Sequence, residues 1–161
     1  MANSSTAYGT YEFDFKDVKA SNEDRLAWLK MLGVLLYDQA AYDTYFPSLS
    51  GISVDDVSES VSLDFEGTGR WTYRSNIDWF QSFDKLKELM LSMDGLRIDI
   101  FYKEYEPGGN FVSKGNYVVR VKNKEVFVDD TDIEEDKLNE KNFVEWGFGS
   151  AAEYDELFEY G

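Results

Sequence analysis

The sequence predicts a single α+β domain with a mainly antiparallel sheet that carries helices on one face. Three observations lead to this prediction. The 161 residues match the size of one domain, and 43% of them are apolar, which is enough for a core. Segments with the two-residue period of strands recur along the chain. Helical segments lie between the early strands, whereas the last strands follow one another directly, an order typical of a helix-on-sheet fold.

The first two expected elements are a strand and a long helix. Tyr11, Phe13 and Phe15 alternate with charged residues, which is the period of a half-buried strand. The segment Ser21-Asn22-Glu23-Asp24 resembles a capping box, and apolar residues at helical spacing follow it to a stop near Phe46-Pro47. These apolar positions are Leu26, Leu29, Gly33, Leu36 and Ala40, widened by Trp28, Leu35 and Tyr42, so we expect the helix to pack across a sheet.

A second strand and a second helix come next. Val61, Leu63 and Phe65 alternate with polar residues, and Gly67-Thr68-Gly69 predicts a bulge or tight bend before Arg70. No P-loop lysine or dinucleotide spacing follows these glycines, so they do not indicate phosphate binding. From Asn76 to a stop at Gly95 the spacing predicts an amphipathic helix with Phe80, Phe83, Leu86, Leu89, Met90 and Met93 on its apolar face.

Three strands complete the expected core, residues 1–128. Period two resumes at Leu96 and continues through Ile98, Ile100 and Tyr102, and the residues 106–110 have turn chemistry. Residues 117–121 and 126–128 predict a tight hairpin around residues 122–124. We expect these side chains to be buried: Leu26, Leu29, Leu36, Phe65, Phe83, Leu86, Ile98, Ile100, Val119 and Val121.

A family resemblance accompanies this order. With Gly67-Thr68-Gly69-Arg70-Trp71 after a strand and Tyr105-Glu106-Pro107-Gly108-Gly109-Asn110-Phe111 between later strands, the chain resembles the ferredoxin-like accessory proteins of phages and plasmids. The resemblance covers residues 61–128. It implies a ferredoxin-like or related core and a mobile-element setting, and it brings no catalytic residues.

The negative charge is concentrated near the end of the chain. The formal net charge is −16, and residues 129–161 account for −10 of it. We interpret residues 129–161 as an acidic C-terminal segment packed on the same domain, with the run from Asp129 to Asp136 as a solvated loop. A capping box at Ser150-Ala151-Ala152-Glu153 predicts a short helix behind it.

Composition excludes several function classes. Without His or Cys, the chain has no His/Cys zinc site and no Ser-His or Cys-His nucleophile pair. The acidic run fails the EF-hand pattern, because Glu135 stands where Gly is needed and Lys141 where the bidentate Glu is needed. We therefore expect no enzyme activity, no cofactor and no metal, although a pair of carboxylates in a pocket remains the alternative.

The location and the direct partners follow from the same composition. Met1 to Phe15 lacks the features of a secretory signal, and no apolar stretch reaches the roughly 20 residues of a membrane span. We expect a cytoplasmic protein. The negative charge disfavours direct binding to nucleic acid or anionic lipid.

The acidic segment instead favours a basic protein partner. Its two densest parts would space their charges by about 4.4 Å in an extended run and by about 2.6 Å in a helix, close to phosphate spacings. We therefore expect an inhibitor that imitates nucleic acid and occupies a basic nucleic-acid-binding surface of a host defence protein, similar in type to phage-encoded anti-CRISPR or anti-restriction proteins. The alternatives are an acidic interaction or immunity-type module unrelated to nucleic acid, and a face that only confers solubility.

Twelve residues are the candidates for contact with this partner. The acids are Asp129, Asp130, Asp132, Glu134, Glu135, Asp136, Glu153, Asp155, Glu156 and Glu159. Trp146 and Phe158 are the candidate aromatic anchors, unless they pack the segment onto the core.

Overall fold

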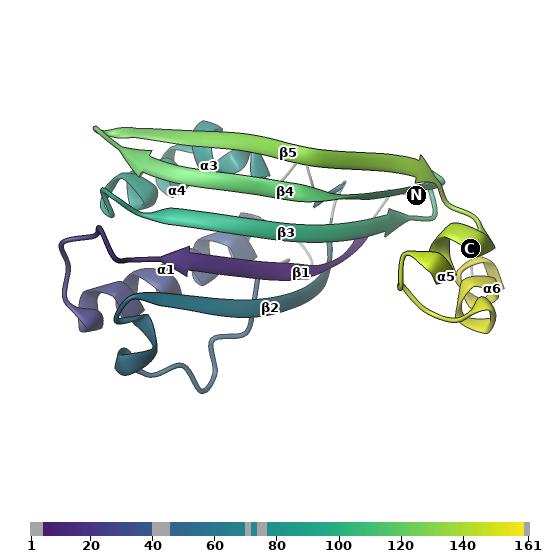
Figure 1. Cartoon of the computed structure of the whole chain (residues 1–161), viewed down its shortest axis with the longest axis horizontal. Helices are drawn as coiled ribbons and strands as arrows, with labels where there is room; N and C mark the ends of the chain where they lie inside the picture. Colours follow the sequence, from purple (N-terminus) through teal and green to yellow (C-terminus); the bar gives the residue numbers. More distant parts are fainter. Residues whose placement is uncertain (1–4, 40–45, 70–71, 74–76, 160–161) are drawn as a thin grey trace.

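A five-stranded antiparallel sheet organises the chain (Figure 1). The computed structural model describes residues 5–39, 46–69, 72–73 and 77–159. The strand order is β2-β1-β3-β4-β5, and every neighbouring pair is antiparallel. The strands are β1 (Ser5–Asp14), β2 (Ser60–Gly69), β3 (Arg97–Glu106), β4 (Phe111–Lys122) and β5 (Glu125–Lys137). The α+β class and the antiparallel sheet are confirmed.

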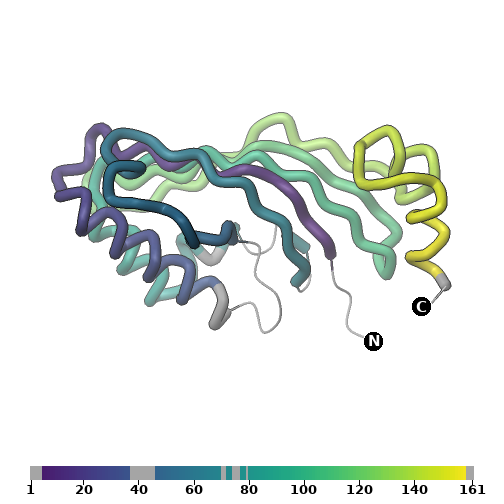
Figure 2. Tube along the Cα trace, turned by 90° about the horizontal axis from the view of Figure 1, so that it is seen from below, coloured from purple at the N-terminus to yellow at the C-terminus, as the bar shows by residue number. Residues whose placement is uncertain are grey.

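Helices cover one face of this sheet, here called the helix face (Figure 2). They are α1 (Asn22–Gln39), α3 (Trp79–Ser82) and α4 (Asp84–Leu91), and the 3-10 turn η1 (Val54–Val57) precedes β2. On the opposite face, here called the open face, the described part of the chain covers one end alone, with α5 (Glu140–Glu145) and α6 (Ala151–Glu159). Among the described residues no helix is both long and apolar enough to cross a membrane.

The helix α1 begins where its cap predicts. The Ser21 hydroxyl accepts a hydrogen bond of 3.1 Å from the Asp24 amide, as an N-cap residue does. Leu29 is buried against the sheet, and the Trp28 indole donates a 2.8 Å bond to the Leu89 carbonyl, which ties α1 to α4. The expected face residues Ala40 and Tyr42 lie outside the described residues.

The expected bulge at Gly67-Thr68-Gly69 is wrong. These residues pair with Ala7, Thr6 and Ser5 in unbroken register, because β1 supplies a partner for every residue of β2. The irregularity lies instead between Lys114 and Asn116 on β4, where β5 inserts an extra residue. Asp132 lies at this bulge with a φ of 55°, a conformation that Asp tolerates better than most residues.

The expected helix between Asn76 and Gly95 is divided, and Asn76 itself lies outside the described residues. Phe83 separates α3 from α4 with φ −94° and ψ 114°, an extended conformation, and acts as the N-cap of α4. The break lets two short helices follow the sheet, so that both Phe80 and Leu86 are buried. Gly95 ends the segment as expected, with a φ of 92°.

The acidic run is not a loop. Asn123 and Lys124 both have positive φ, 54° and 64°, and form the two-residue turn of the predicted hairpin. The second strand of that hairpin does not stop at Val128, because β4 is long enough to offer partners down to Phe111. The run from Asp129 to Asp136 therefore belongs to β5, and the 128/129 boundary falls inside this strand.

Two apolar clusters hold the structure together. The main cluster fills the space between the sheet and α1, α3 and α4. Of the expected core residues, Leu26, Leu36 and Phe83 are only half-buried, and the others are buried.

The second cluster joins Tyr105 and Val112 of the open face to Phe143 and Phe148 of the C-terminal segment. That segment contains two helices, not one. The capping box of α6 is confirmed, since Ser150 and Glu153 exchange two bonds of 3.2 Å.

Candidate partner-binding surface

The acids of residues 129–136 lie on a strand at the edge of the sheet. In the part of the chain that the structure describes, β5 has only β4 as a neighbour. Side chains alternate between the two faces of a strand. Asp130 stands opposite Tyr117 and Glu135 opposite Ser113, so both point to the helix face, whereas Asp129 points to the open face. Glu134 and Asp136, opposite Lys114 and Val112, share the open face.

On the open face, cations of β4 compensate these acids. Arg120 Nη2 lies 3.2 Å from Asp129 Oδ2, and Lys114 Nζ lies 3.7 Å from Glu134 Oε2. All four side chains are about half-exposed or more, so each pair contributes little to stability, about 0–1 kcal/mol. The open face is therefore closer to charge balance than its many acids indicate.

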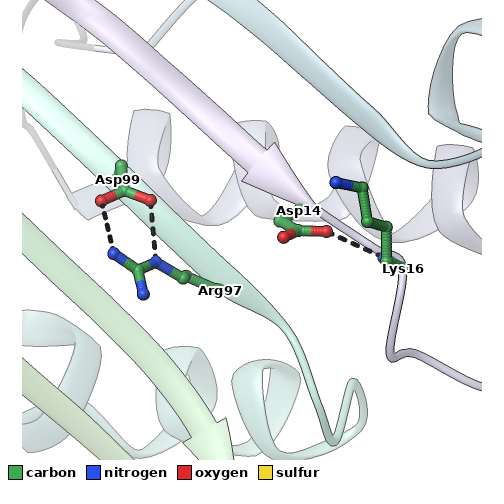
Figure 3. Close-up of polar contacts among 4 residues, drawn as sticks. All are labelled: Asp14, Lys16, Arg97 and Asp99. Atoms are coloured by element: carbon green, nitrogen blue, oxygen red, sulfur yellow. Dashed lines mark hydrogen bonds and ion pairs between the residues drawn. The ribbon is translucent and has the colours of Figure 1, made fainter.

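The same compensation recurs on the neighbouring strand β3, where Arg97 stands opposite Arg120 (Figure 3). The Arg97 guanidinium makes two bonds to the Asp99 carboxylate, of 2.9 and 3.2 Å. This bonding is the main reason that the pKa of Arg97 is raised. The neighbouring Asp14 carboxylate accepts a 3.0 Å bond from the Lys16 amide instead.

The helix face collects acids around a cavity of about 380 Å³. Four carboxylates line it together with Thr72, Phe111 and Tyr117: Asp78, Glu104, Asp130 and Glu135. Glu104 is fully buried, and its Oε2 accepts a 2.7 Å bond from the Tyr73 amide. Among the described residues no group of three His, Cys, Asp or Glu is arranged to hold a metal ion.

Asp78 and Glu104 are members of this lining that sequence analysis missed. The period of β3 contains a signal for Glu104, because the inward positions Ile98, Ile100 and Tyr102 continue to residue 104. No local pattern indicates Asp78, which reaches the cavity only through the fold.

The acids of α6 form a separate surface. This helix packs on α5 at the end of the sheet, where the rings of Tyr154 and Phe143 lie 5.7 Å apart, while β5 runs along one border (Figure 1). Asp155 and Glu156 are exposed, whereas Glu153 is engaged in the capping box. The side chain of Glu159 lies outside the described residues. The acids of β5 and those of α6 therefore do not form one continuous row.

The two candidate anchors differ in their surroundings. Trp146 is half-buried, and Lys114 Nζ lies 4.6 Å from the centre of its ring. Its carbonyl, with that of Gly147, accepts bonds of 3.0 and 3.2 Å from Lys103 Nζ. Trp146 therefore holds the C-terminal helices on the open face. Phe158 is 48% exposed and stacks only edge-to-face on Tyr154.

The comparisons with known proteins add no assignment to this surface. Neither protein-family models, nor curated proteins, nor solved structures give a match to the chain.

Proposed function

We propose that this protein is a non-enzymatic inhibitor that imitates nucleic acid and occupies the basic nucleic-acid-binding surface of a host defence protein. The observation that carries the proposal is that six acids of residues 129–136 lie on an extended edge strand. In this conformation they are spaced by about 4.4 Å per charge, against about 3.4 Å for the phosphates of a single nucleic-acid strand.

The charge pairs on the open face are compatible with this role. Asp129 and Glu134 have exposed partners on β4, and such pairs exchange readily for a partner's cations because they are weak. Asp130, Asp132 and Asp136 have no ion pair within the described residues. A dense anionic edge raises the rate of encounter with a basic surface.

The setting is part of the same proposal. We place the protein in the cytoplasm of a host cell, as an anti-CRISPR or anti-restriction type of product of a phage or plasmid. Within the α+β class, the ferredoxin-like relationship and the mobile-element origin rest on the resemblance of residues 61–128 alone.

A second candidate function is an acidic interaction or immunity-type module unrelated to nucleic acid. The cavity on the helix face favours it, because Asp78 and Asp130 line one local hollow and not a row of charges along a strand. In this case the partner would contribute a single lysine or arginine as the centre of the contact.

Capture from a nuclease-treated bacterial lysate distinguishes these candidates. If the first proposal holds, the captured protein binds DNA or RNA, and added nucleic acid releases it. Retention of the partner at saturating DNA and RNA would contradict mimicry and favour the second candidate.

Neutral substitutions then locate the contact. The β5 variant carries Asp130→Asn, Asp132→Asn and Asp136→Asn, which preserve shape, and Asn tolerates the positive φ at residue 132. A second variant carries Asp155→Asn and Glu156→Gln, and leaves Glu153 to cap α6. The control removes three exposed acids elsewhere, with Glu59→Gln, Glu88→Gln and Asp94→Asn.

We expect the β5 variant alone to associate more slowly with the captured partner and to depend less on salt. The free energy of unfolding should change by less than about 0.5 kcal/mol in all three, because exposed acids add little stability. Equal association rates for the β5 variant and the control would remove β5 from the site.

A further inference from the structure

The free edge of β5 exposes backbone hydrogen-bonding groups at alternate residues. Lys122 and Glu125 flank the two-residue turn and therefore form a hydrogen-bonded pair. Bonded and non-bonded pairs then alternate along the register. The N–H and C=O of Asp129 bond to β4, whereas those of Val128 and Asp130 point away from the sheet.

At both ends of β5, outward backbone groups already have hydrogen-bond partners. The Val126 carbonyl, which also points outward, accepts a 2.9 Å bond from Gln81 Nε2 of α3. At the far end, the outward Lys137 amide donates a 2.7 Å bond to Asp136 Oδ1. Among the described residues, the outward backbone groups of Val128 and Asp130 therefore have no hydrogen-bond partner.

We propose that this edge binds a lysine- or arginine-rich extended segment of the partner as a sixth strand of the sheet. The inference rests on the proposed function and specifies how the partner is recognised. Backbone pairing supplies affinity in such strand addition, and side chains at alternate positions supply specificity. Acids flank the edge on both faces, with Asp129 on one and Asp130 on the other, so cations of an added strand meet a carboxylate whichever way they point.

The same acids disfavour pairing of this edge with a second copy of the protein. A long free edge invites pairing with a second copy of itself, which proteins avoid by placing charges there. Two β5 strands would bring their acidic runs together and repel, whereas a basic strand gains from the same charges. The bulge at Asp132 changes the twist of the edge, so we expect regular pairing at Val128 and Asp130 and less beyond.

A pair of synthetic peptides separates strand addition from simple charge attraction. Both have nine residues that alternate lysine and threonine. The first is N-methylated at every second residue, which leaves one intact edge and prevents assembly beyond a dimer. The second is N-methylated at every residue, so it carries the same charge and no backbone donor.

We expect the first peptide to bind roughly fivefold to a hundredfold more tightly, because it alone can form two or more backbone hydrogen bonds with the edge. Equal binding of both would overturn strand addition and leave the electrostatic proposal intact. Absence of binding by either peptide at low salt would count against both.

Amide hydrogen exchange locates the added strand in the unaltered protein. Without peptide, the amides of Val128 and Asp130 should exchange rapidly, whereas that of Asp129 is already protected by β4. The first peptide should slow exchange at Val128 and Asp130 at least roughly tenfold, and the second should not. Unchanged exchange at both amides under saturating first peptide would refute the proposal.

A proline variant provides the matched control. Asp130→Pro removes one outward N–H from the edge, where proline is tolerated, and Asp130→Asn removes only the same charge. We expect Asp130→Pro to weaken the first peptide several-fold more than Asp130→Asn. Equal affinities of the two folded variants would contradict pairing at this residue.

Discussion

Gly115 of β4 lies directly against Ile133 of β5, with no room for a side chain between them. A Cβ added to Gly115 would overlap the Cδ1 atom of Ile133. This contact lies at the bulge, where Ile133 turns toward the helix face and packs against the main core. Because Gly115 has no side chain, Ile133 of the acidic edge strand has room to reach the core.

Gly115→Ala should therefore destabilise the protein by about 1–3 kcal/mol, as overpacked substitutions do. The free energy of unfolding in urea measures this loss. The double variant Gly115→Ala/Ile133→Ala should lose less than the sum of the single variants, because the clash is gone. Additive losses would show that the two residues do not interact.

Arg25 should be essential for the junction between α1 and the loops beside it. Its buried guanidinium donates hydrogen bonds to the carbonyls of Phe15, Val18, Val57 and Ser58. Arg25→Met leaves these acceptors without their donor, so we expect a loss of about 3 kcal/mol or more in urea unfolding. Arg25→Lys should restore little, since an ammonium group lacks the planar set of donors.

The control for this change is Arg97→Met, which removes an exposed guanidinium paired with Asp99. It should cost less than about 1 kcal/mol. Similar losses for the two methionine variants would contradict the role assigned to Arg25.

Stability should fall at alkaline pH because of buried tyrosines. The hydroxyls of Tyr11 and Tyr73 share a 2.9 Å hydrogen bond, and burial raises the pKa of both. Burial also raises the pKa of Tyr8 to about 12. The native state thus holds these protons more tightly than the unfolded chain, so the free energy of unfolding decreases as the pH rises above about 10.

Urea unfolding between pH 7 and pH 11 tests this dependence. Tyrosine ionisation should leave the free energy of unfolding unchanged near neutral pH and lower it above about pH 10. Tyr8→Phe should make the fall shallower. A curve for Tyr8→Phe that coincides with that of the unaltered protein would show that Tyr8 ionises equally in both states.

Trp146 and Phe158 should respond differently to truncation. Trp146→Ala removes the ring beneath Lys114 and loosens the C-terminal helices, so α5 and α6 should lose protection from amide exchange. Phe158→Ala removes a ring that is largely exposed and should change stability by less than about 1 kcal/mol. If Phe158 is a partner anchor, its truncation instead raises the dissociation rate of the captured protein.

Lys103→Met provides an independent test of how the C-terminal helices are attached. It removes the bonds to the carbonyls of Trp146 and Gly147, so exchange in α5 should rise as it does for Trp146→Ala. Lys85→Met, at an exposed position of α4, should leave this exchange unchanged. A rise of equal size in both variants would contradict a specific attachment by Lys103.

The sequence correctly predicted the elements that depend on residues close to one another in the chain. The Ser21 and Ser150 caps mark helix starts because a side chain bonds to an amide three residues away. The alternation in Tyr11, Phe13 and Phe15 predicts a strand because neighbouring side chains point to opposite faces. Asn123 lies in the hairpin turn for the same kind of reason, since it tolerates positive φ.

Elements that depend on a partner strand far away in the chain had no signal in the sequence or a misleading one. The run from Asp129 to Asp136 has the composition of a solvated loop, yet it forms a strand because β4 offers it backbone partners. The glycines of β2 predict a bulge, but every residue of β2 pairs with β1 in unbroken register. The break at Phe83 follows from the two short helices fitting the sheet.

The sequence by itself determined the sign, size and chain position of the charge. Only the tertiary structure decided which acids have a cation beside them. Asp129 and Glu134 meet cations of β4, whereas Asp130 has no ion pair among the described residues and faces the carboxylate-lined cavity. The reason is physical: charge interaction falls with distance, and distances between residues far apart in the chain are set by strand register, which no local segment encodes.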